Sequence, residues 1–183
     1  MFDYVISDLH LDHENIISKC NRPFSSGKEM DQTLLTNWNT TVSHDDEVLF
    51  LGDLSLTDPQ TERDLYNSLN GNITFIIGNH DNTELSEHAG PLFNSIEFET
   101  KGLTIKCSHY PENITIEDHT EYGFHGHVHN NDVDTYPFFH PHTSLFNFSA
   151  ELVGYTPVPF ENVLDILLRQ KSRKTETYTE HLQ

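Results

Sequence analysis

The feature that most constrains the fold of this chain is a series of short, continuous apolar runs. Three of them lie in the first 80 residues: "DYVIS" at 3–7, "EVLFLG" at 47–52 and "NITFIIG" at 72–78. Two segments with a helical apolar period, 27–42 and 58–71, separate these runs. Strands that are apolar on successive residues are typical of a parallel sheet whose two faces are covered. The pattern therefore predicts an α/β layer architecture.

A second group of strands is expected from residue 95 onward. The runs at 95–100, 103–108, 121–126 and 144–152 are joined by short connections, and Lys101-Gly102 suits a hairpin turn. A final helix is expected after Pro159. We therefore predict two packed mixed β-sheets flanked by helices, with the second sheet the more antiparallel. The length suits a single domain, which we place at 1–170, followed by a polar C-terminal tail at 171–183.

The charge of the chain is strongly negative. The formal net charge is -19, from 29 acidic and 10 basic residues. Such a surface suits a protein that stays soluble in concentrated salt, where the screening length falls to about 3 Å at 1 M and self-repulsion fades. We expect a halophilic host or one of its viruses, with an acidic protein of an ordinary cytoplasm as the alternative. The charge does not indicate a nucleic-acid partner.

Other features of the sequence exclude several classes of protein. No apolar run reaches the length of about 18 residues that a membrane span needs, and the N-terminus lacks the basic and apolar segments of an export signal. Two cysteines, Cys20 and Cys107, are too few for a disulfide framework. We expect a cytoplasmic protein, or one of the host cytoplasm if it is viral, with no membrane partner.

Five of these runs, at 3–7, 47–52, 72–78, 103–108 and 121–126, lead directly into side chains that can bind metal ions. Because the carboxyl ends of strands border the ligand crevice in open α/β sheets, five such ends are expected to meet in one place. Gly52, Gly78 and Gly126 directly precede three of these groups, as expected where the backbone comes close to a ligand. The candidate ligands are Asp8, His10, Asp53, Asn79, His109, His127 and His129.

The donor set indicates the kind of metal. Carboxylate, amide and imidazole groups without a thiolate favour hard to borderline divalent ions over a structural zinc site. These ligands are more than one tetrahedral ion needs, whereas two ions that share a carboxylate would use them all. We expect two divalent ions, with Mn²⁺ as the first choice and Ni²⁺, Co²⁺, Fe²⁺ or Zn²⁺ as alternatives.

Five short motifs resemble those of the calcineurin-like metallophosphoesterase superfamily. They are "DLH" at 8–10, "GD" at 52–53, "GNHD" at 78–81, "SHYP" at 108–111 and "GHVH" at 126–129. One motif alone is a weak signal, but the ordered set at strand ends is specific. The segments "CNRPF" at 20–24 and "FNFSAEL" at 146–152 also look like those of small stand-alone members. The resemblance implies a four-layer sandwich of two sheets and flanking helices.

The resemblance also implies a role for each donor. Asp53 would bridge the two ions. His80 would not bind metal; it would lie beside the leaving-group oxygen and donate a proton or stabilise the developing charge. The remaining ligands would divide into two sets, Asp8, His10 and His129 around one ion and Asn79, His109 and His127 around the other.

The implied reaction is one-step hydrolysis of a phosphate ester, with a hydroxide that bridges the two ions as the nucleophile. The substrate would be a phosphodiester or a phosphomonoester. A small diester, a nucleotide or a nucleic-acid end is expected, because the chain lacks room for a large nucleic-acid-binding domain. A non-catalytic metal-bound scaffold with the same fold is the alternative. The interpretation without a functional site is that the same residues only form turns and cap helices or strands.

Several further residues have competing interpretations. Arg22, one of only ten basic residues, could clamp a substrate phosphate with two hydrogen bonds or form a surface ion pair. His13 could face the substrate, support a ligand or lie on the surface. The orienting partner of His80 is open, with Asp58 as a distant candidate. The loop at 134–144 could fold over the cleft or pack over a sheet edge.

Overall fold

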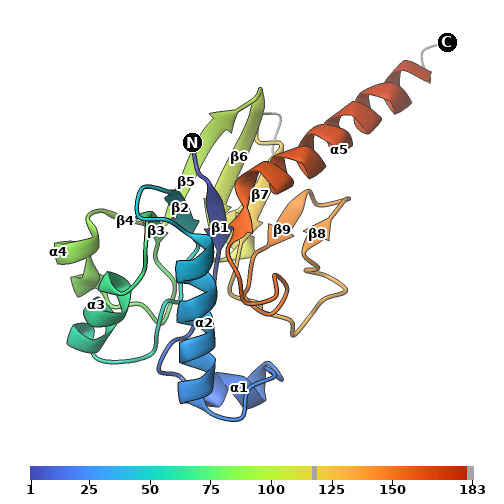
Figure 1. Ribbon diagram of the computed structural model, residues 1–183. Coiled ribbons are helices and arrows are strands. Elements are labelled where there is room, and N and C mark those ends of the chain that lie inside the picture. Colours follow the sequence, from blue (N-terminus) through green and yellow to red (C-terminus); the bar gives the residue numbers. More distant parts are fainter. Residues whose placement is uncertain (117–118, 181–183) are drawn as a thin grey trace.

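The computed structural model describes residues 1–116 and 119–180, with the side chains of the last helix described as far as residue 172. Its strands form two five-stranded sheets (Figure 1). The first sheet consists of β1 (Tyr4–Ile6), β2 (Glu47–Phe50), β3 (Asn72–Ile76), β4 (Leu92–Phe93) and β10 (Val158–Pro159), in the order β10-β1-β2-β3-β4. β1 to β4 are parallel and β10 is antiparallel to β1, which confirms the largely parallel sheet expected from the apolar runs.

The second sheet has the order β5-β6-β7-β9-β8 and consists of β5 (Ser95–Thr100), β6 (Leu103–Ser108), β7 (Tyr122–His125), β8 (Phe139–His140) and β9 (Leu145–Asn147). β5 and β6 form a hairpin whose turn residues, Lys101 and Gly102, have φ of 48° and 73°, as in a type I′ turn. β7 pairs in parallel with both β6 and β9. The second sheet is therefore mixed and more antiparallel than the first, as expected, and its parallel pairs arise because the segments after β6 and β7 are long enough to cross over.

The helices are α1 (Asn15–Lys19), α2 (Gly27–Thr41), α3 (Pro59–Asn67), α4 (Ser86–Ala89) and α5 (Phe160–Glu180), with short 3₁₀ turns η1 (Thr83–Leu85) and η2 (Pro111–Asn113). α2 buries Met30, Leu34 and Trp38 along one face. α3 begins at Asp58, whose carboxylate accepts two backbone hydrogen bonds of the first turn, and has Pro59 at its first position. Among the described helices, none combines the length and the apolar character that crossing a bilayer requires.

Two apolar cores hold these layers together. The first packs the two sheets and α5 against one another, with Leu49, Phe124 and Leu164 as members from each. The second packs the opposite face of the first sheet against α1, α2 and α3, where the rings of Trp38 and Phe50 lie 6.0 Å apart between centroids. The predicted α/β fold of two mixed sheets flanked by helices is thus confirmed.

α5 continues through the segment that the sequence suggested as a polar tail. The helix runs to Glu180 and projects away from the sheets toward the C-terminus (Figure 1). Near the middle of α5, the Lys171 Nζ donates a hydrogen bond to the Gly102 carbonyl at 2.7 Å and pairs with the Glu121 carboxylate at 3.0 Å. Residue 170 therefore lies inside a helix and marks no structural boundary.

The loop at 134–144 packs over the edge of the second sheet. β8 lies within it, and the ring of Phe139 stacks on Phe146 of β9 at 4.4 Å between centroids. Phe138 meets Phe146 and Phe148 edge-on at 5.7 and 5.5 Å. Of the two interpretations of this loop, the structure supports packing over a sheet edge.

Candidate metal centre

The seven predicted metal ligands all follow the carboxyl ends of strands. Asp8 and His10 follow β1, Asp53 follows β2, Asn79 follows β3, His109 follows β6, and His127 and His129 follow β7. The packing of the two sheets brings these strand ends together, and the described residues form four groups of donor atoms, with all atoms of a group within 4.8 Å of one another. Two groups consist of predicted ligands alone: Asp8, His10 and His129, and Asp53, His109 and His127. The other two add His80 to His10 and Asp53, and Cys20 and Glu151 to His129.

Asp53 lies between the two groups. Its Oδ2 atom is 3.4 Å from the His10 Nε2 and 3.5 Å from the His109 Nε2. Its other oxygen, Oδ1, accepts a hydrogen bond from the backbone amide of His80 at 2.9 Å, which holds the carboxylate in place. The Asn79 side chain, exposed to solvent, lines the same cleft. The position of Asp53 is the one that a bridging carboxylate requires.

The backbone at most of these ligands is in the left-handed region. Such conformations in residues other than glycine cost about 1–3 kcal/mol each and persist where the surrounding structure enforces them, often at functional sites. The ligands concerned, with their φ angles, are Asp8 (59°), His10 (53°), Asp53 (60°), His127 (71°) and His129 (49°). Five strained ligands in one cluster are not explained by turn or capping chemistry alone.

Three glycines allow the strand ends to approach one another, as the sequence predicted. A Cβ atom on Gly126 would overlap the Asp8 carboxylate, and one on Gly78 would lie 2.7 Å from the Asp53 amide nitrogen. Gly52 has φ of 97°, and a Cβ atom there would lie 2.7 Å from the Gly78 nitrogen. Any side chain at these positions would push the ligand loops apart.

The imidazole of His10 is available as a metal ligand. Burial lowers the pKa of His10 to about 2, against the opposing charge of Asp53, and the ring is therefore neutral. Its Nε2 atom is buried and has no hydrogen-bond partner among the described residues. A buried polar nitrogen without a partner is costly and calls for an explanation. Coordination of a cation would satisfy it.

The other groups are poised to exchange protons for a cation. Burial alone would lower the pKa of His109, but the hydrogen bond and charge of Asp53 raise it to about 9. Burial alone would raise the pKa of Asp53, but the neighbouring His109 and His10 rings hold this pKa below its ordinary range. Burial alone would lower the pKa of His129, but hydrogen bonds with Cys20 and Glu151 raise it to about 11. These neighbouring groups fit divalent cations, which compete with protons for the same lone pairs.

Asp81 supports the loops rather than the metal. Its carboxylate accepts hydrogen bonds from the amides of Asp53, Leu54 and Gly78 at 2.8, 2.7 and 2.7 Å. Burial, helped by the charge of Asp53, raises the pKa of Asp81 to about 7 despite these bonds. This one side chain therefore ties the end of β2 to the end of β3.

Comparison with known proteins decides the family. The model of the calcineurin-like phosphoesterase superfamily domain matches residues 1–147. The chain belongs to this superfamily. The uncharacterized protein MJ1445 of Methanocaldococcus jannaschii is 39% identical over 174 residues, 94% of each chain. The crystal structure of AQ665, a protein of unknown function from Aquifex aeolicus, is similar with a TM-score of 0.70 and 26% identity, over 89% of this chain and 97% of that one.

His80 and His13 lie side by side at the cleft of this member of the calcineurin-like phosphoesterase superfamily. The His80 ring centroid is 5.1 Å from that of His10 and 5.8 Å from that of His13. His13 is buried, and its Nδ1 lies 3.2 Å from the His10 Nδ1, so it both supports a ligand and faces the cleft. A ring nitrogen of His80 also lies within 4.8 Å of donor atoms of His10 and Asp53. Asp58 is not its partner, because it caps α3.

Arg22 is not placed as a phosphate clamp, and its ion pair is not on the surface. The side chain is 4% exposed, and its Nη1 and Nη2 donate to the backbone carbonyls of Leu9 and Asp8, both at 2.7 Å. Its Nε and Nη2 also contact the Glu151 carboxylate at 2.8 and 2.7 Å. These contacts direct the guanidinium into the protein, because a buried carboxylate needs a cationic partner.

The cleft has a volume of about 190 Å³. Besides metal ligands, His13 and His80, the described residues of its wall include Lys19 and Cys20 at the end of α1 and Asn131 after β7. Lys19 was not among the residues predicted for the site, although a basic residue shortly after the first motif is a signal of a phosphate-binding group in so acidic a chain. Glu151 was not among them either, and its signal was the motif "FNFSAEL".

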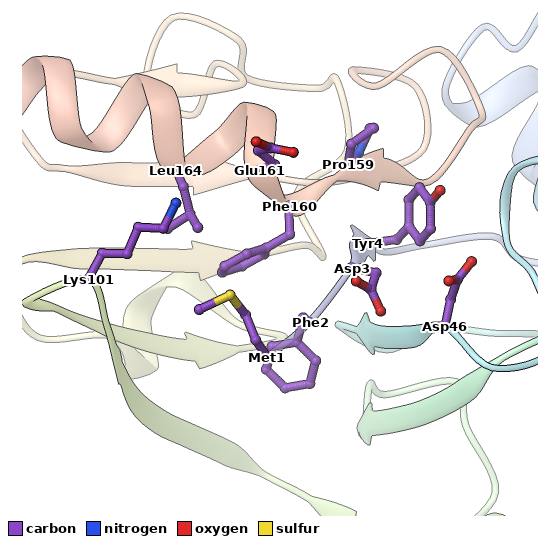
Figure 2. Close-up of a pocket in the computed structure, with 10 residues that line it drawn as sticks. All are labelled: Met1, Phe2, Asp3, Tyr4, Asp46, Lys101, Pro159, Phe160, Glu161 and Leu164. Carbon is purple, nitrogen blue, oxygen red and sulfur yellow. The ribbon is translucent and has the colours of Figure 1, made fainter.

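A larger hollow of about 340 Å³ lies at the amino end of β1, the opposite end from the metal ligands. Figure 2 shows Met1, Phe2 and Phe160 grouped along it, with Lys101 and Glu161 at its margin. No imidazole or amide side chain is among the described residues that line it. Size alone therefore does not locate the candidate site of this chain; the donor chemistry does.

Proposed function

We propose that the protein is a metal-dependent phosphoesterase that hydrolyses a small phosphodiester or phosphomonoester at a centre of two divalent ions, with Mn²⁺ the first ion to try. The observation that supports this most is the pair of donor groups joined by Asp53, with His80 at the same cleft. When bound, two such ions supply Lewis acidity and activate water for attack on phosphorus. The family assignment supports the same reaction class.

The chain's own residues have separate tasks in this proposal. Asp8, His10 and His129 would hold one ion, and Asn79, His109 and His127 the other, with Asp53 shared. The His80 side chain lines the cleft beside the predicted ligands. It would donate a proton to the leaving oxygen or stabilise the charge that develops there. The hydrogen bond from the His80 backbone amide to the Asp53 carboxylate would keep this ring close to the bound ions.

The size and charge of the cleft favour a small substrate. About 190 Å³ accommodates a phosphate group and the atoms next to it, and leaves the rest of a larger ester outside. Lys19 and Asn131 at the wall offer a cation and an amide for the phosphate oxygens. A net charge of -19 repels long nucleic acids at low salt.

The first test is hydrolysis of bis-p-nitrophenyl phosphate and p-nitrophenyl phosphate with Mn²⁺, Ni²⁺, Co²⁺, Zn²⁺ or Mg²⁺, at low and at multimolar salt. We expect metal-dependent turnover, and the ratio of diester to monoester rates would define the substrate class. Folded, metal-loaded protein without turnover in any condition would instead support the non-catalytic scaffold.

The variant His80→Gln tests the role of this histidine. We expect kcat to fall about 10²- to 10⁴-fold, the range for loss of a general acid, while the protein retains as much metal as the unaltered chain. His44→Gln, at an exposed histidine before β2, is the matched control and should change neither quantity. If His80→Gln loses metal, His80 is a ligand and the proposed division of roles is wrong.

A further inference from the structure

A buried carboxylate contacts the ring nitrogen of His129 that faces away from the other predicted ligands. The His129 Nδ1 lies 3.1 and 3.2 Å from the two carboxylate oxygens of Glu151, while its Nε2 points toward the Asp8 carboxylate at 3.9 Å. The Glu151 side chain is only 2% exposed. A carboxylate on the far nitrogen of a ligating imidazole fixes the ring's orientation and tautomer and increases its basicity.

Arg22 connects Glu151 to the first ligand loop. The guanidinium contacts one Glu151 oxygen through Nε and Nη2 at 2.8 and 2.7 Å. It also donates to the backbone carbonyls of Asp8 and Leu9, both at 2.7 Å. These two carbonyls immediately precede His10, where the backbone is in the left-handed region. One buried ion pair therefore contacts the ring of His129 and the main chain that places Asp8 and His10.

The segment that carries Glu151 holds His129 at a second point. The Asn147 side-chain amide donates to the His129 backbone carbonyl at 2.9 Å. Asn147 and Glu151 both belong to the motif "FNFSAEL", and Arg22 belongs to "CNRPF". "CNRPF" and "FNFSAEL" contain none of the seven predicted ligands. Both motifs support His129, "FNFSAEL" through Glu151 and Asn147, and "CNRPF" through the contact of Arg22 with Glu151.

The other donor group is supported differently. The far nitrogen of His109, Nδ1, contacts the backbone carbonyl of Leu51 at 2.8 Å. Asp53 is held through Asp81 and the amide of His80. Neither Arg22 nor Glu151 has a described contact with His109, His127 or Asp53. The two halves of the centre therefore have different supports behind their histidines, and they meet where the His127 amide donates to the Asp8 carboxylate at 3.1 Å.

We propose that Glu151 and Arg22 are positioning residues for one ion alone, the one held by Asp8, His10 and His129. This inference rests on the proposed two-ion centre. Removing the carboxylate should weaken that ion and leave the ion held by His109 and His127 in place. A pair that served only the general stability of the fold would weaken both ions together.

The variant Glu151→Gln tests the proposal with Mn²⁺ alone, by equilibrium dialysis and electron paramagnetic resonance of the bound ions. For the unaltered chain we expect two equivalents with the spectrum of a coupled pair. For Glu151→Gln we expect one tight ion with an uncoupled spectrum, and a second bound about 10- to 100-fold more weakly, the usual effect of losing such a support. High Mn²⁺ should restore the coupled spectrum.

Glu121→Gln is the control, because Glu121 also pairs with a basic residue, Lys171, but outside the cleft. It should bind both ions as the unaltered chain does. If Glu151→Gln folds poorly, Arg22→Lys provides the second test, since it keeps the charge but cannot contact Glu151 and both backbone carbonyls at once as the guanidinium does. It should weaken the same single ion.

The inference is overturned if Glu151→Gln binds both ions normally, or if both ions weaken equally while circular dichroism shows a folded protein. The binding data separate this inference from the proposed function. Two bound ions without turnover in the unaltered chain would contradict the phosphoesterase proposal only. Turnover with unchanged binding in both variants would contradict the positioning role only.

Discussion

Whether a histidine joins the metal centre depends on its position relative to a strand end. His109 follows β6 directly, and His127 follows β7 by one residue, whereas His125 lies within β7 and packs against the Tyr136 ring at 5.5 Å. The sequence could predict that the candidate ligands lie close together, because each one lies shortly after an apolar run. It could not assign Glu151, because its partner Arg22 is 129 residues away and no local pattern links them.

Lys19 is expected to bind the substrate phosphate in place of Arg22. The variant Lys19→Gln should raise KM about three- to tenfold with little change in kcat, because a partly exposed charge contact is worth about 1 kcal/mol and acts equally in the ground and transition states. Steady-state kinetics at low salt would measure this. Lys28→Gln, at an exposed position of α2, is the matched control. An effect confined to kcat would contradict a binding role.

Most elements were predictable, and their pairing partners less so. The helix expected at 27–42 is α2 (Gly27–Thr41), and the turn expected at Lys101-Gly102 joins β5 to β6. The parallel pairing of β7 with β6 and β9 was missed, because strand order depends on crossovers that periodicity does not report. The continuation of α5 to Glu180 was also missed, since a polar sequence there has no apolar stripe to indicate a helix.

The turn after β7 gives a prediction at the level of one element. Gly126→Ala would place a methyl group against the Asp8 carboxylate and the Ser7 side chain. We expect a loss of about 1–3 kcal/mol in unfolding free energy, as for overpacking, together with weakened binding of the ion held by Asp8. Urea denaturation and metal titration would measure the two effects.

Gly102→Ala separates backbone strain from crowding at the metal site. Gly102 has positive φ but no atom near its would-be Cβ, so the substitution should cost about 1 kcal/mol and leave metal binding unchanged. Equal metal loss in Gly102→Ala and Gly126→Ala would contradict the close-approach explanation.

Charge is a property of the whole molecule. At a net charge of -19, repulsion among surface carboxylates opposes the compact state, and salt weakens that repulsion. We therefore predict that the urea midpoint rises between about 0.1 and 1 M KCl, over which the screening length falls from about 10 to about 3 Å. The variant Asp45→Lys/Glu87→Lys/Glu99→Lys, at three exposed positions, changes the charge by two units per site, from -19 to -13. It should flatten the salt dependence, and an unchanged slope would contradict an origin in self-repulsion.

Neither of the two proposed ligand sets is complete within one sheet. Asp8 and His10 come from the first sheet and His129 from the second, while Asn79 comes from the first and His127 from the second. The His127 amide, 119 residues from Asp8 along the chain, reaches its carboxylate at 3.1 Å. Contacts between such distant parts of a chain form slowly. Ion capture should therefore come at the end of folding, and in stopped-flow refolding the uptake of Mn²⁺ would time the docking of the two sheets.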